Sequence, residues 1–246
     1  VILHNFRAGV VDRLGLDYDS VLAINPSIVY TVISGFGAKG PRSADPAYDG
    51  AVQAAAGMMA NNGTAESGPL RTGYMPVDLM TGMTAAYATT AALLRKQKTG
   101  KGQMVDVAML DCAITLGSAN FSRSEVDDIP DMLIGNQSIT SAPTASSFPT
   151  AEGAILTAAI MPNHVEAFFD EIGLKEMLND PKFATREARI ENKEIVRDAM
   201  IEALKSDTAE NWEKRLAPRG VPVAKINSVK ETARLEQLQY RNILTA

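Results

Sequence analysis

Reactive sulfur and imidazole side chains are scarce in this chain of 246 residues. The single cysteine, Cys112, cannot form a disulfide within the chain, and the mostly apolar run 105–116 around it predicts a buried, inert thiol. The two histidines, His4 and His164, stand far apart and lack the clustered spacing of metal ligands. We therefore expect neither an intrachain disulfide nor a metal site.

Long apolar runs and an excess of positive charge are also missing. No uninterrupted apolar run approaches the length of a membrane span. The formal net charge of −5 does not suggest a nucleic-acid partner. What is present is ordinary for a globular protein, with 46% hydrophobic and 22% charged residues, so a core of normal size is available. No signal-peptide pattern begins the chain, and we expect a cytoplasmic protein with neither a membrane nor a nucleic-acid partner.

The first part of the chain has the pattern of a βαβ unit. Residues 1–3 form a short apolar strand, and Asp17 can cap a helix over residues 18–24. Residues 27–34 are rich in β-branched side chains, which favours a buried parallel strand. Strand, helix and strand in this order predict an α/β domain. The Gly- and Pro-rich loop 35–46 then lies at the carboxyl end of a strand, where open α/β sheets bind ligands.

The rest of the chain predicts further helices and a second domain. The pattern indicates strands at 103–107 and 154–160 and helices at 49–60, 79–98, 109–120, 164–172, 186–204 and 209–216. Residues 95–103 are typical of a helix C-terminus, with a contribution to phosphate binding as the alternative. The long irregular segment 122–147 separates the two parts. We expect a Rossmann-like domain over residues 1–121 and a smaller α+β domain over residues 122–246.

Asp78 draws attention because it follows Pro76-Val77 and precedes a long helix of small residues. Asp is among the preferred helix N-cap residues, so capping alone would explain it. A carboxylate can also act as a nucleophile that forms covalent intermediates. Position and residue type do not choose between these two interpretations.

A series of short motifs over nearly the whole chain resembles the class III CoA-transferases. This group includes formyl-CoA transferase, carnitine CoA-transferase and α-methylacyl-CoA racemase. The motifs are Asn5-Phe6-Arg7, Asp12-Arg13-Leu14-Gly15, Asn25-Pro26, Ser34-Gly35-Phe36-Gly37, Gly40-Pro41, Tyr48-Asp49 and the run from Arg95 to Gln103. Their order and spacing, rather than any one of them, make the resemblance specific.

The resemblance implies a Rossmann-like CoA-binding domain, and it assigns roles to individual residues. Asp78 matches the catalytic carboxylate of the family. Tyr48 and Asp49 match a pair that lines the substrate pocket, and Gly135 and Asn136 match a substrate-binding Gly-Asn pair. Asn5, Phe6, Arg13 and Met109 fall where the family contacts CoA. Two of these residues also have structural interpretations: Tyr48 as a half-buried core residue, and Arg13 as an ion-pair partner of Asp12 or Asp17.

The implied reaction moves CoA from an acyl-CoA donor to a carboxylic acid through an aspartyl anhydride and an aspartyl-CoA thioester. CoA is a substrate here, and no permanently bound cofactor is expected. The alternatives are an acyl-CoA racemase or isomerase of the same fold, or an inactive CoA-binding chain. The racemase branch carries a histidine where this chain has Tyr48, so a two-base racemase would lack one base.

Two further expectations follow from the resemblance. The formyl-CoA type of transferase carries a glycine-rich flap after its Gly-Asn pair, whereas Gln137-Ser138-Ile139-Thr140-Ser141 contains no glycine. Segment 135–147 is nevertheless the candidate for a flap. Family members carry residues before Val1 and after Ala246, so we expect this sequence to be the middle of a longer chain that forms an interlocked homodimer.

Overall fold

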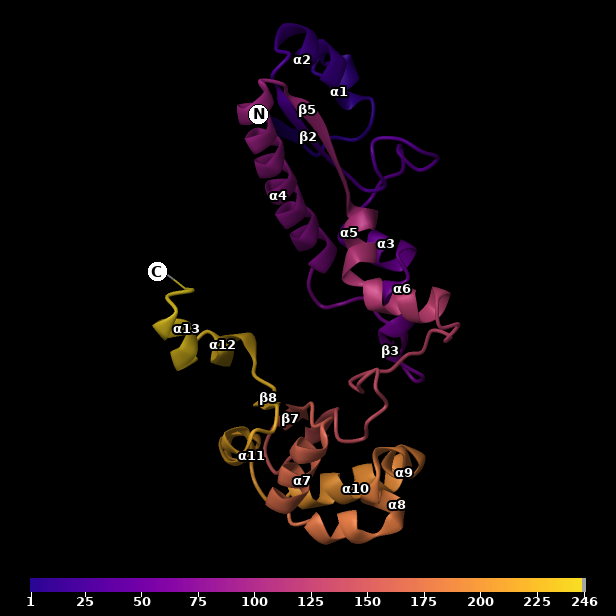
Figure 1. Cartoon of the computed structure of the whole chain (residues 1–246), viewed down its shortest axis with the longest axis vertical. Helices are drawn as coiled ribbons and strands as arrows, with labels where there is room; N and C mark the ends of the chain where they lie inside the picture. Colours follow the sequence, from indigo (N-terminus) through magenta and orange to yellow (C-terminus); the bar gives the residue numbers. More distant parts are fainter. Residues whose placement is uncertain (245–246) are drawn as a thin grey trace. The chain divides into compact units, whose positions relative to one another are not determined.

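The structure, a computed structural model, describes residues 1–244 and divides into two compact units (Figure 1). The first unit is Val1–Gly135 and the second is Asn136–Ala246. The domain boundary expected at 121/122 falls inside helix α6 (Ser118–Glu125). The chain stays with the first unit beyond that helix because the Asn61 side chain donates to Asp131, and the Gly135 N–H donates to the Gly63 carbonyl.

The first unit is built on a parallel sheet of three strands in the order β1–β2–β5. The predicted βαβ unit is confirmed, with Asp17 accepting a hydrogen bond from the Ser20 N–H at the start of its helix. The strands are β1 (Ile2–His4), β2 (Val29–Ser34) and β5 (Gln103–Ala108). The helices are α1 (Val10–Arg13), α2 (Tyr18–Ile24), α3 (Asp49–Ala55), α4 (Pro76–Thr99), α5 (Met109–Leu116) and α6.

The segment between α3 and α4 is more structured than expected. The predicted helix over 49–60 ends at Ala55 and is followed by a 3₁₀ helix, η1 (Met58–Asn61), because Gly57 adopts a left-handed φ of 72°. A small hairpin of β3 (Gly63–Thr64) and β4 (Gly68–Pro69) then occupies part of the expected polar loop. Two-residue strands of this kind are too short to produce a hydrophobic period.

Helix α4 packs along strands β2 and β5 (Figure 1). Ala85 and Ala92 are buried in one cluster with Val29, Val105, Val107 and Cys112, so the prediction of a buried thiol is confirmed. Between the same elements, the hydroxyls of Thr31 and Thr89 share a buried hydrogen bond of 2.7 Å. Small side chains thus allow α4 to approach the sheet closely.

The end of α4 confirms the predicted C-cap. Gly100 adopts a left-handed φ of 72°, and its N–H donates to the Lys96 carbonyl. The Arg95 guanidinium donates to Gln103 Oε1 at 2.9 Å. Glycine is favoured at such a position because it carries no Cβ.

The second unit combines an antiparallel sheet of order β6–β7–β8 with helices, which is an α+β arrangement. The expected strand 154–160 ends at residue 157, and the expected helix 186–204 is interrupted at Asn192. The strands are β6 (Ser147–Pro149), β7 (Ala154–Thr157) and β8 (Val223–Lys225). The helices are α7 (Pro162–Glu171), η2 (Lys175–Asn179), α8 (Pro181–Ala184), α9 (Arg186–Glu191), α10 (Lys193–Leu204), α11 (Ala209–Leu216), η3 (Ala217–Arg219), α12 (Val229–Thr232) and α13 (Glu236–Tyr240).

The second unit has a core of large side chains. Phe148, Phe168, Phe169 and Trp212 are all buried in it. Over residues 1–244, every helix is too short or too polar to span a bilayer.

Candidate active site

The carboxyl ends of the three parallel strands converge on a cavity of about 510 Å³. Asn5 follows β1, Gly35 follows β2 and Met109 follows β5, so each strand delivers a lining residue. Of the predicted site residues, the cavity brings together Asn5, Phe6, Tyr48, Asp78 and Met109. The remaining lining residues are Arg7, Ala8, Ile33, Ser34, Gly35, Ser43, Asp45, Ala47, Thr81 and Gly82. This position is the one at which open α/β sheets bind ligands.

Asp78 is not the N-cap of its helix, so the capping interpretation is wrong. Helix α4 begins at Pro76, with Met75 at the N-cap position, and Asp78 is its third residue. The Met75 side chain forms no capping hydrogen bond. The sequence interpretation failed because proline at the first helical position moved the start of the helix three residues earlier than expected.

The capping carboxylate comes instead from Asp49, at the start of α3. Its Oδ2 accepts hydrogen bonds from the N–H groups of Val77 at 2.9 Å and Asp78 at 3.1 Å. These are donors that the first turn of a helix leaves without an intrahelical partner. Asp49 is only 5% exposed, and it does not line the cavity itself. Because Asp49 caps the helix, the Asp78 carboxylate is left exposed at the cavity.

The environment of Asp78 makes its carboxylate more basic than usual. Partial burial raises the pKa of Asp78, and the nearby charge of Asp49 raises it further. A carboxylate with a raised pKa is a stronger nucleophile and base, and such shifts gather at functional sites. Both the position of Asp78 in the cavity and its raised pKa therefore indicate Asp78 as the candidate reactive group.

Tyr48 lies at the surface of the cavity. It is 81% exposed and occupies the N-cap position of α3, so the alternative of a half-buried core tyrosine is wrong. Its phenol is available to a molecule bound in the cavity. The next residue, Asp49, is buried, so Tyr48 faces the cavity and Asp49 faces the interior.

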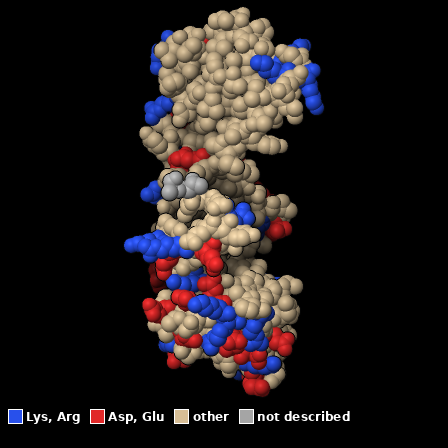
Figure 2. Space-filling view, turned by 90° about the vertical axis from the view of Figure 1, so that its left-hand side faces the viewer, with Lys and Arg blue, Asp and Glu red and all other residues tan. Residues whose placement is uncertain are grey.

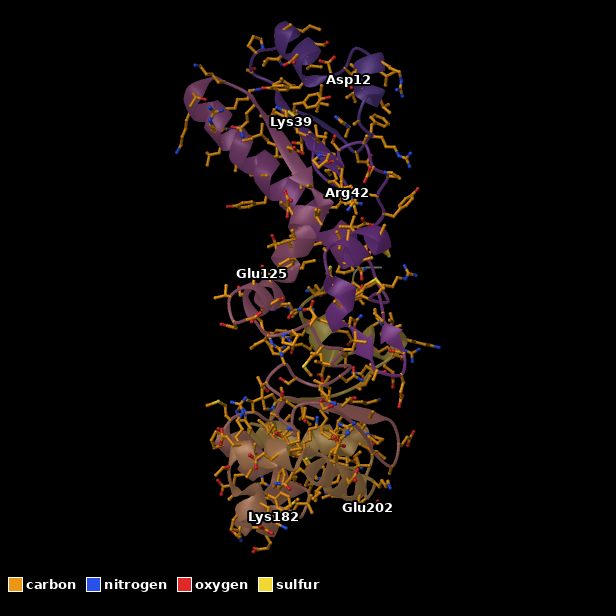
Figure 3. All side chains as sticks on the ribbon, turned by 90° about the vertical axis from the view of Figure 1, so that its right-hand side faces the viewer. Asp12, Lys39, Arg42, Glu125, Lys182 and Glu202 are labelled. Carbon is orange, nitrogen blue, oxygen red and sulfur yellow. The ribbon has the colours of Figure 1, made fainter. Side chains whose placement is uncertain are left out.

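A smaller cavity of about 180 Å³ lies beside the first and shares Phe6, Arg7, Ala8, Ser34 and Ser43 with it. Its aromatic wall includes Tyr30 and His4, which stacks on Phe6 with 5.8 Å between ring centroids. Asp12, labelled in Figure 3, also lines it.

Arg13 lines neither cavity. It forms no ion pair with Asp12 or Asp17 within the described residues, so the alternative interpretation of Arg13 as their ion-pair partner is wrong. Asp17 is used instead to cap α2, where it accepts from both the N–H and the hydroxyl of Ser20.

The loop after β2 is held in place by charge and stacking. The Arg42 guanidinium lies 3.8 Å from the centroid of the Phe36 ring and pairs with Asp45 at 2.8 Å. Figure 3 labels Arg42 on this loop, whose residue Asp45 lines the larger cavity. The Ala38 N–H also donates to the Asp106 carboxylate on β5. These contacts position one wall of the cavity.

The predicted Gly-Asn pair spans the boundary between the two units, with Gly135 in the first and Asn136 in the second. Gly135 is not among the residues that line this cavity. Gly135 has a left-handed φ of 56°, and an added Cβ would lie 3.0 Å from the Thr64 side chain. In the second unit, the Asn136 side chain donates to the Ser147 hydroxyl at 3.0 Å. The Ser138 N–H donates to the Ala145 carbonyl, so the candidate flap forms a closed loop.

Sequence reasoning missed the partners of Asp49. Gln53 is 1% exposed and donates to Asp49 Oδ1 at 2.5 Å and to the Thr72 hydroxyl at 3.0 Å. The Thr72 N–H donates back to Gln53 Oε1 at 3.0 Å. The spacing of four between Asp49 and Gln53 places them on one helix face, a signal that was available from the sequence.

Known CoA-transferases are similar to this chain over nearly its whole length. An acetyl-CoA:oxalate CoA-transferase of Acetobacter aceti is 34% identical over 246 residues, covering 99% of this chain and 63% of that protein. A succinate–glutarate CoA-transferase of Agrobacterium fabrum is 29% identical over 249 residues, covering 99% of this chain and 60% of that protein. The chain thus spans about three fifths of the length of the curated relatives it matches.

A solved structure is also similar to this chain. The crystal structure of a CaiB/BaiF family protein from Brucella suis superposes with a TM-score of 0.87 at 28% identity, covering 97% of this chain and 63% of that one. The family described as CoA-transferase family III matches residues 1–246. The chain therefore belongs to CoA-transferase family III.

Proposed function

We propose that the protein transfers CoA from an acyl-CoA donor to a free carboxylic acid, with Asp78 as the nucleophile. The observation that carries this proposal is that two nearby carboxylates have different surroundings. Asp49 accepts the hydrogen bonds that cap α4, whereas Asp78 is exposed in the cavity at the carboxyl ends of the strands. The names of the relatives, which are CoA-transferases, support the same reaction class.

In the proposed reaction, an oxygen of the Asp78 carboxylate attacks the carbonyl carbon of the donor thioester. The C–S bond breaks, and a mixed anhydride and the CoA thiolate form. The thiolate then attacks the aspartyl carbonyl carbon, which releases the donor acid as a carboxylate and leaves an aspartyl-CoA thioester. The acceptor carboxylate attacks this thioester, giving a second anhydride and thiolate. Attack of the thiolate on the acceptor acyl carbon yields the new acyl-CoA and regenerates Asp78.

These reaction steps consume neither water nor a net proton. Because water would hydrolyse the anhydride and thioester intermediates, the site has to exclude it. The residues around Asp78 suit that task. We assign Asn5, Phe6 and Met109 to binding CoA, because they follow or adjoin the strand ends beside Asp78. The Tyr48 hydroxyl is available to orient the acyl or acid group, and Gly82, one turn along α4 from Asp78, leaves room for the thioester.

The acids exchanged are open to a direct screen. The relatives are named for acetyl-CoA with oxalate and for succinate with glutarate. We propose a short carboxylic acid as the acceptor. Acetyl-, formyl- and succinyl-CoA should each be incubated with oxalate, formate, succinate and glutarate, and new thioesters detected by mass spectrometry.

The nucleophile is tested in the full-length enzyme with Asp78→Asn and Asp78→Ala. Both variants should reduce transfer to background. Trapping with hydroxylamine after addition of donor acyl-CoA should modify Asp78 in a peptide map. Asp45→Asn is the comparison variant, because Asp45 lines the same cavity but pairs with Arg42, and it should lower transfer much less than Asp78→Asn does. Full activity of Asp78→Ala would refute the proposed role.

The racemase alternative has a separate test, because it needs a second base where this chain has Tyr48. A 2-methylacyl-CoA is incubated with the full-length enzyme in deuterated water without an acceptor acid. Under the transferase proposal, deuterium uptake at the α-carbon is slow relative to CoA transfer. Rapid uptake would favour the racemase.

We also propose that the whole protein is a homodimer. Helix α4 carries large apolar side chains on the face turned away from the sheet, with Leu79 64%, Met83 72% and Tyr87 78% exposed. Apolar side chains in such a row are typical of a surface that another polypeptide covers. Light scattering of the full-length protein measures the assembly.

A further inference from the structure

A partly buried hydrogen-bond relay connects helix α3, the segment before α4 and the first turn of α4. Gln53 stands at its centre and donates with one amide hydrogen to Asp49 and with the other to the Thr72 hydroxyl. Its carbonyl oxygen accepts from the Thr72 N–H, and the Thr72 hydroxyl donates in turn to the Tyr74 carbonyl. Both donors of the amide and its acceptor oxygen are therefore used inside the protein.

The orientation of the Gln53 amide is determined by these partners. Turning the amide over would place its oxygen against the Asp49 carboxylate and its NH₂ group against the Thr72 N–H. Both new contacts would be repulsive. Gln53 thus presents a hydrogen-bond donor to Asp49 in a fixed direction.

The opposite oxygen of Asp49 performs the capping. Asp49 Oδ1 is held by Gln53, while Oδ2 accepts from the N–H groups of Val77 and Asp78. A change in the position of Asp49 would be transmitted directly to the backbone of Asp78. Gln53 is therefore linked through Asp49 to the backbone N–H of Asp78.

We propose that Gln53 is a positioning residue for Asp78: it locks Asp49 against the first turn of α4 and so keeps the Asp78 carboxylate aimed into the cavity. This inference rests on the proposed function, in which Asp78 is the nucleophile. Gln53 does not line the cavity, so it acts only through Asp49 and Thr72. Displacement of a reacting group by about 1 Å costs a rate of the order of 100-fold.

The test uses the full-length enzyme with Gln53→Met, which keeps the length of the side chain and removes all of its hydrogen bonds. We expect kcat to fall by about 10- to 100-fold. We expect KM for the acyl-CoA to change by less than about threefold, because the CoA-binding residues are untouched. The rate of Asp78 trapping by hydroxylamine should fall in parallel with kcat.

Thr89→Val is the matched control, because it also removes a buried hydrogen bond that holds α4, but three turns away from Asp78. It should lower the stability of the protein while leaving kcat within about twofold of the wild type. This control separates positioning from a general loss of structure. If Gln53→Met and Thr89→Val lower kcat equally, the positioning role is refuted.

A second pair of variants tests the hydrogen bond between Gln53 and Asp49 by exchanging its donor and its acceptor. In Gln53→Glu, a carboxylate faces Asp49, and kcat should fall at least as far as in Gln53→Met. Adding Asp49→Asn lets an amide at position 49 donate to Glu at position 53 while its oxygen still caps α4. We expect this double variant to recover at least about tenfold in kcat over Gln53→Glu.

The outcomes distinguish this inference from the function on which it rests. If Asp78→Asn is inactive and Gln53→Met keeps kcat within twofold, the positioning role is wrong and the nucleophile stands. If Asp78→Asn remains active, the proposed function itself is wrong. Failure of the double variant to exceed Gln53→Glu would also count against positioning through Asp49.

Discussion

The two units of the chain differ in the number of ion pairs and charged side chains on their surfaces. Within residues 1–244, all ion pairs except Arg42–Asp45 lie in the second unit. Figure 2 shows the same contrast, with acidic and basic side chains mixed over the second unit and few charges on the visible face of the first. Interspersed charges of both signs are typical of a surface that faces water.

The cores of the two units differ in the same sense. The second unit buries large aromatic residues such as Phe148, Phe168 and Trp212, whereas the cluster beneath α4 consists of valine, alanine and cysteine. In the first unit, several large apolar side chains lie outside, on the free face of α4. The second unit therefore has its own core of large side chains, whereas the first unit has a row of exposed apolar side chains along one helix. Each of the following experiments tests one side of this difference.

The largest expected effect is on the ability to fold alone. Residues 136–246 expressed separately should be monodisperse and unfold cooperatively, because their core is complete. Residues 1–135 should aggregate, because the exposed side chains of α4 form an apolar patch. Light scattering and thermal melts followed by circular dichroism measure both. If residues 1–135 were a monodisperse monomer, the two units would not differ in their ability to fold alone.

Charge on the face of α4 should separate assembly from folding. Met83→Glu with Tyr87→Glu introduces two carboxylates on exposed positions of this helix. We expect the full-length protein to lose its dimer and to keep its helical content, because neither side chain belongs to the buried core of α4. Sedimentation velocity gives the assembly state. Glu210→Gln, on the surface of the second unit, is the control and should leave assembly unchanged.

Truncation of a core aromatic residue should affect the second unit alone. Phe168→Ala is expected to cost about 3–5 kcal/mol of the free energy of unfolding of this unit. The only tryptophan, Trp212, is buried in the same core, so its fluorescence reports on this unit. Denaturant titration followed by fluorescence gives the change. A cost below about 1 kcal/mol would show that this core is loosely packed.

The hydrogen bond between Thr31 and Thr89 tests the packing of α4 on the sheet. Thr89→Val leaves the buried hydroxyl of Thr31 without its partner and should cost about 1–3 kcal/mol. Replacing both residues by valine should be closer to neutral, because no polar group is then stranded. The difference between the single and the double variant, measured by denaturation, isolates this contact.

The smallest effects concern pH, and they have opposite signs in the two units. Hydrogen bonds from Lys225 and Ser228 lower the pKa of Glu231 to about 2, from 4.5. Its stabilising effect is therefore complete above pH 4.5 and is lost as the pH falls toward 2. Burial and the nearby Asp49 raise the pKa of Asp78 above 3.8. Asp78 therefore contributes to stability below pH 3.8, and this contribution is lost as the pH rises through the raised pKa.

Accordingly, Glu231→Gln should lower stability at pH 7 and have no effect near pH 2. Asp78→Asn should instead raise stability at pH 7 and lose this advantage near pH 3. Denaturation of the two variants and the wild type at these pH values gives the sign of each change. The same sign for both variants would contradict the opposite pKa shifts of Asp78 and Glu231.

Local patterns in the sequence predicted much of the secondary structure. The β-branched run that forms β2, the Asp17 cap of α2 and the Gly100 end of α4 depend on neighbouring residues only, and all three are present. The short strands β6 and β8 were not predicted, because three residues are too few to show a period. The family resemblance named several residues that meet at the strand ends, such as Asn5, Tyr48 and Asp78, but Arg13 and Asp49, which it also named, do not line the cavity.

The sequence by itself determined the family, the βαβ start and the candidate carboxylate Asp78. Only the tertiary structure decided which carboxylate caps α4. Asp49 and Asp78 lie 29 positions apart in the chain, and nothing local to either shows that Asp49 Oδ2 accepts from the Asp78 N–H. Capping by a distant residue depends on how α3 packs against α4, and that packing depends on contacts spread over the whole unit. The hydrogen bond between Gln53 and Asp49 is local, at a spacing of four, but only the long-range contact of Asp49 with α4 connects Gln53 to Asp78.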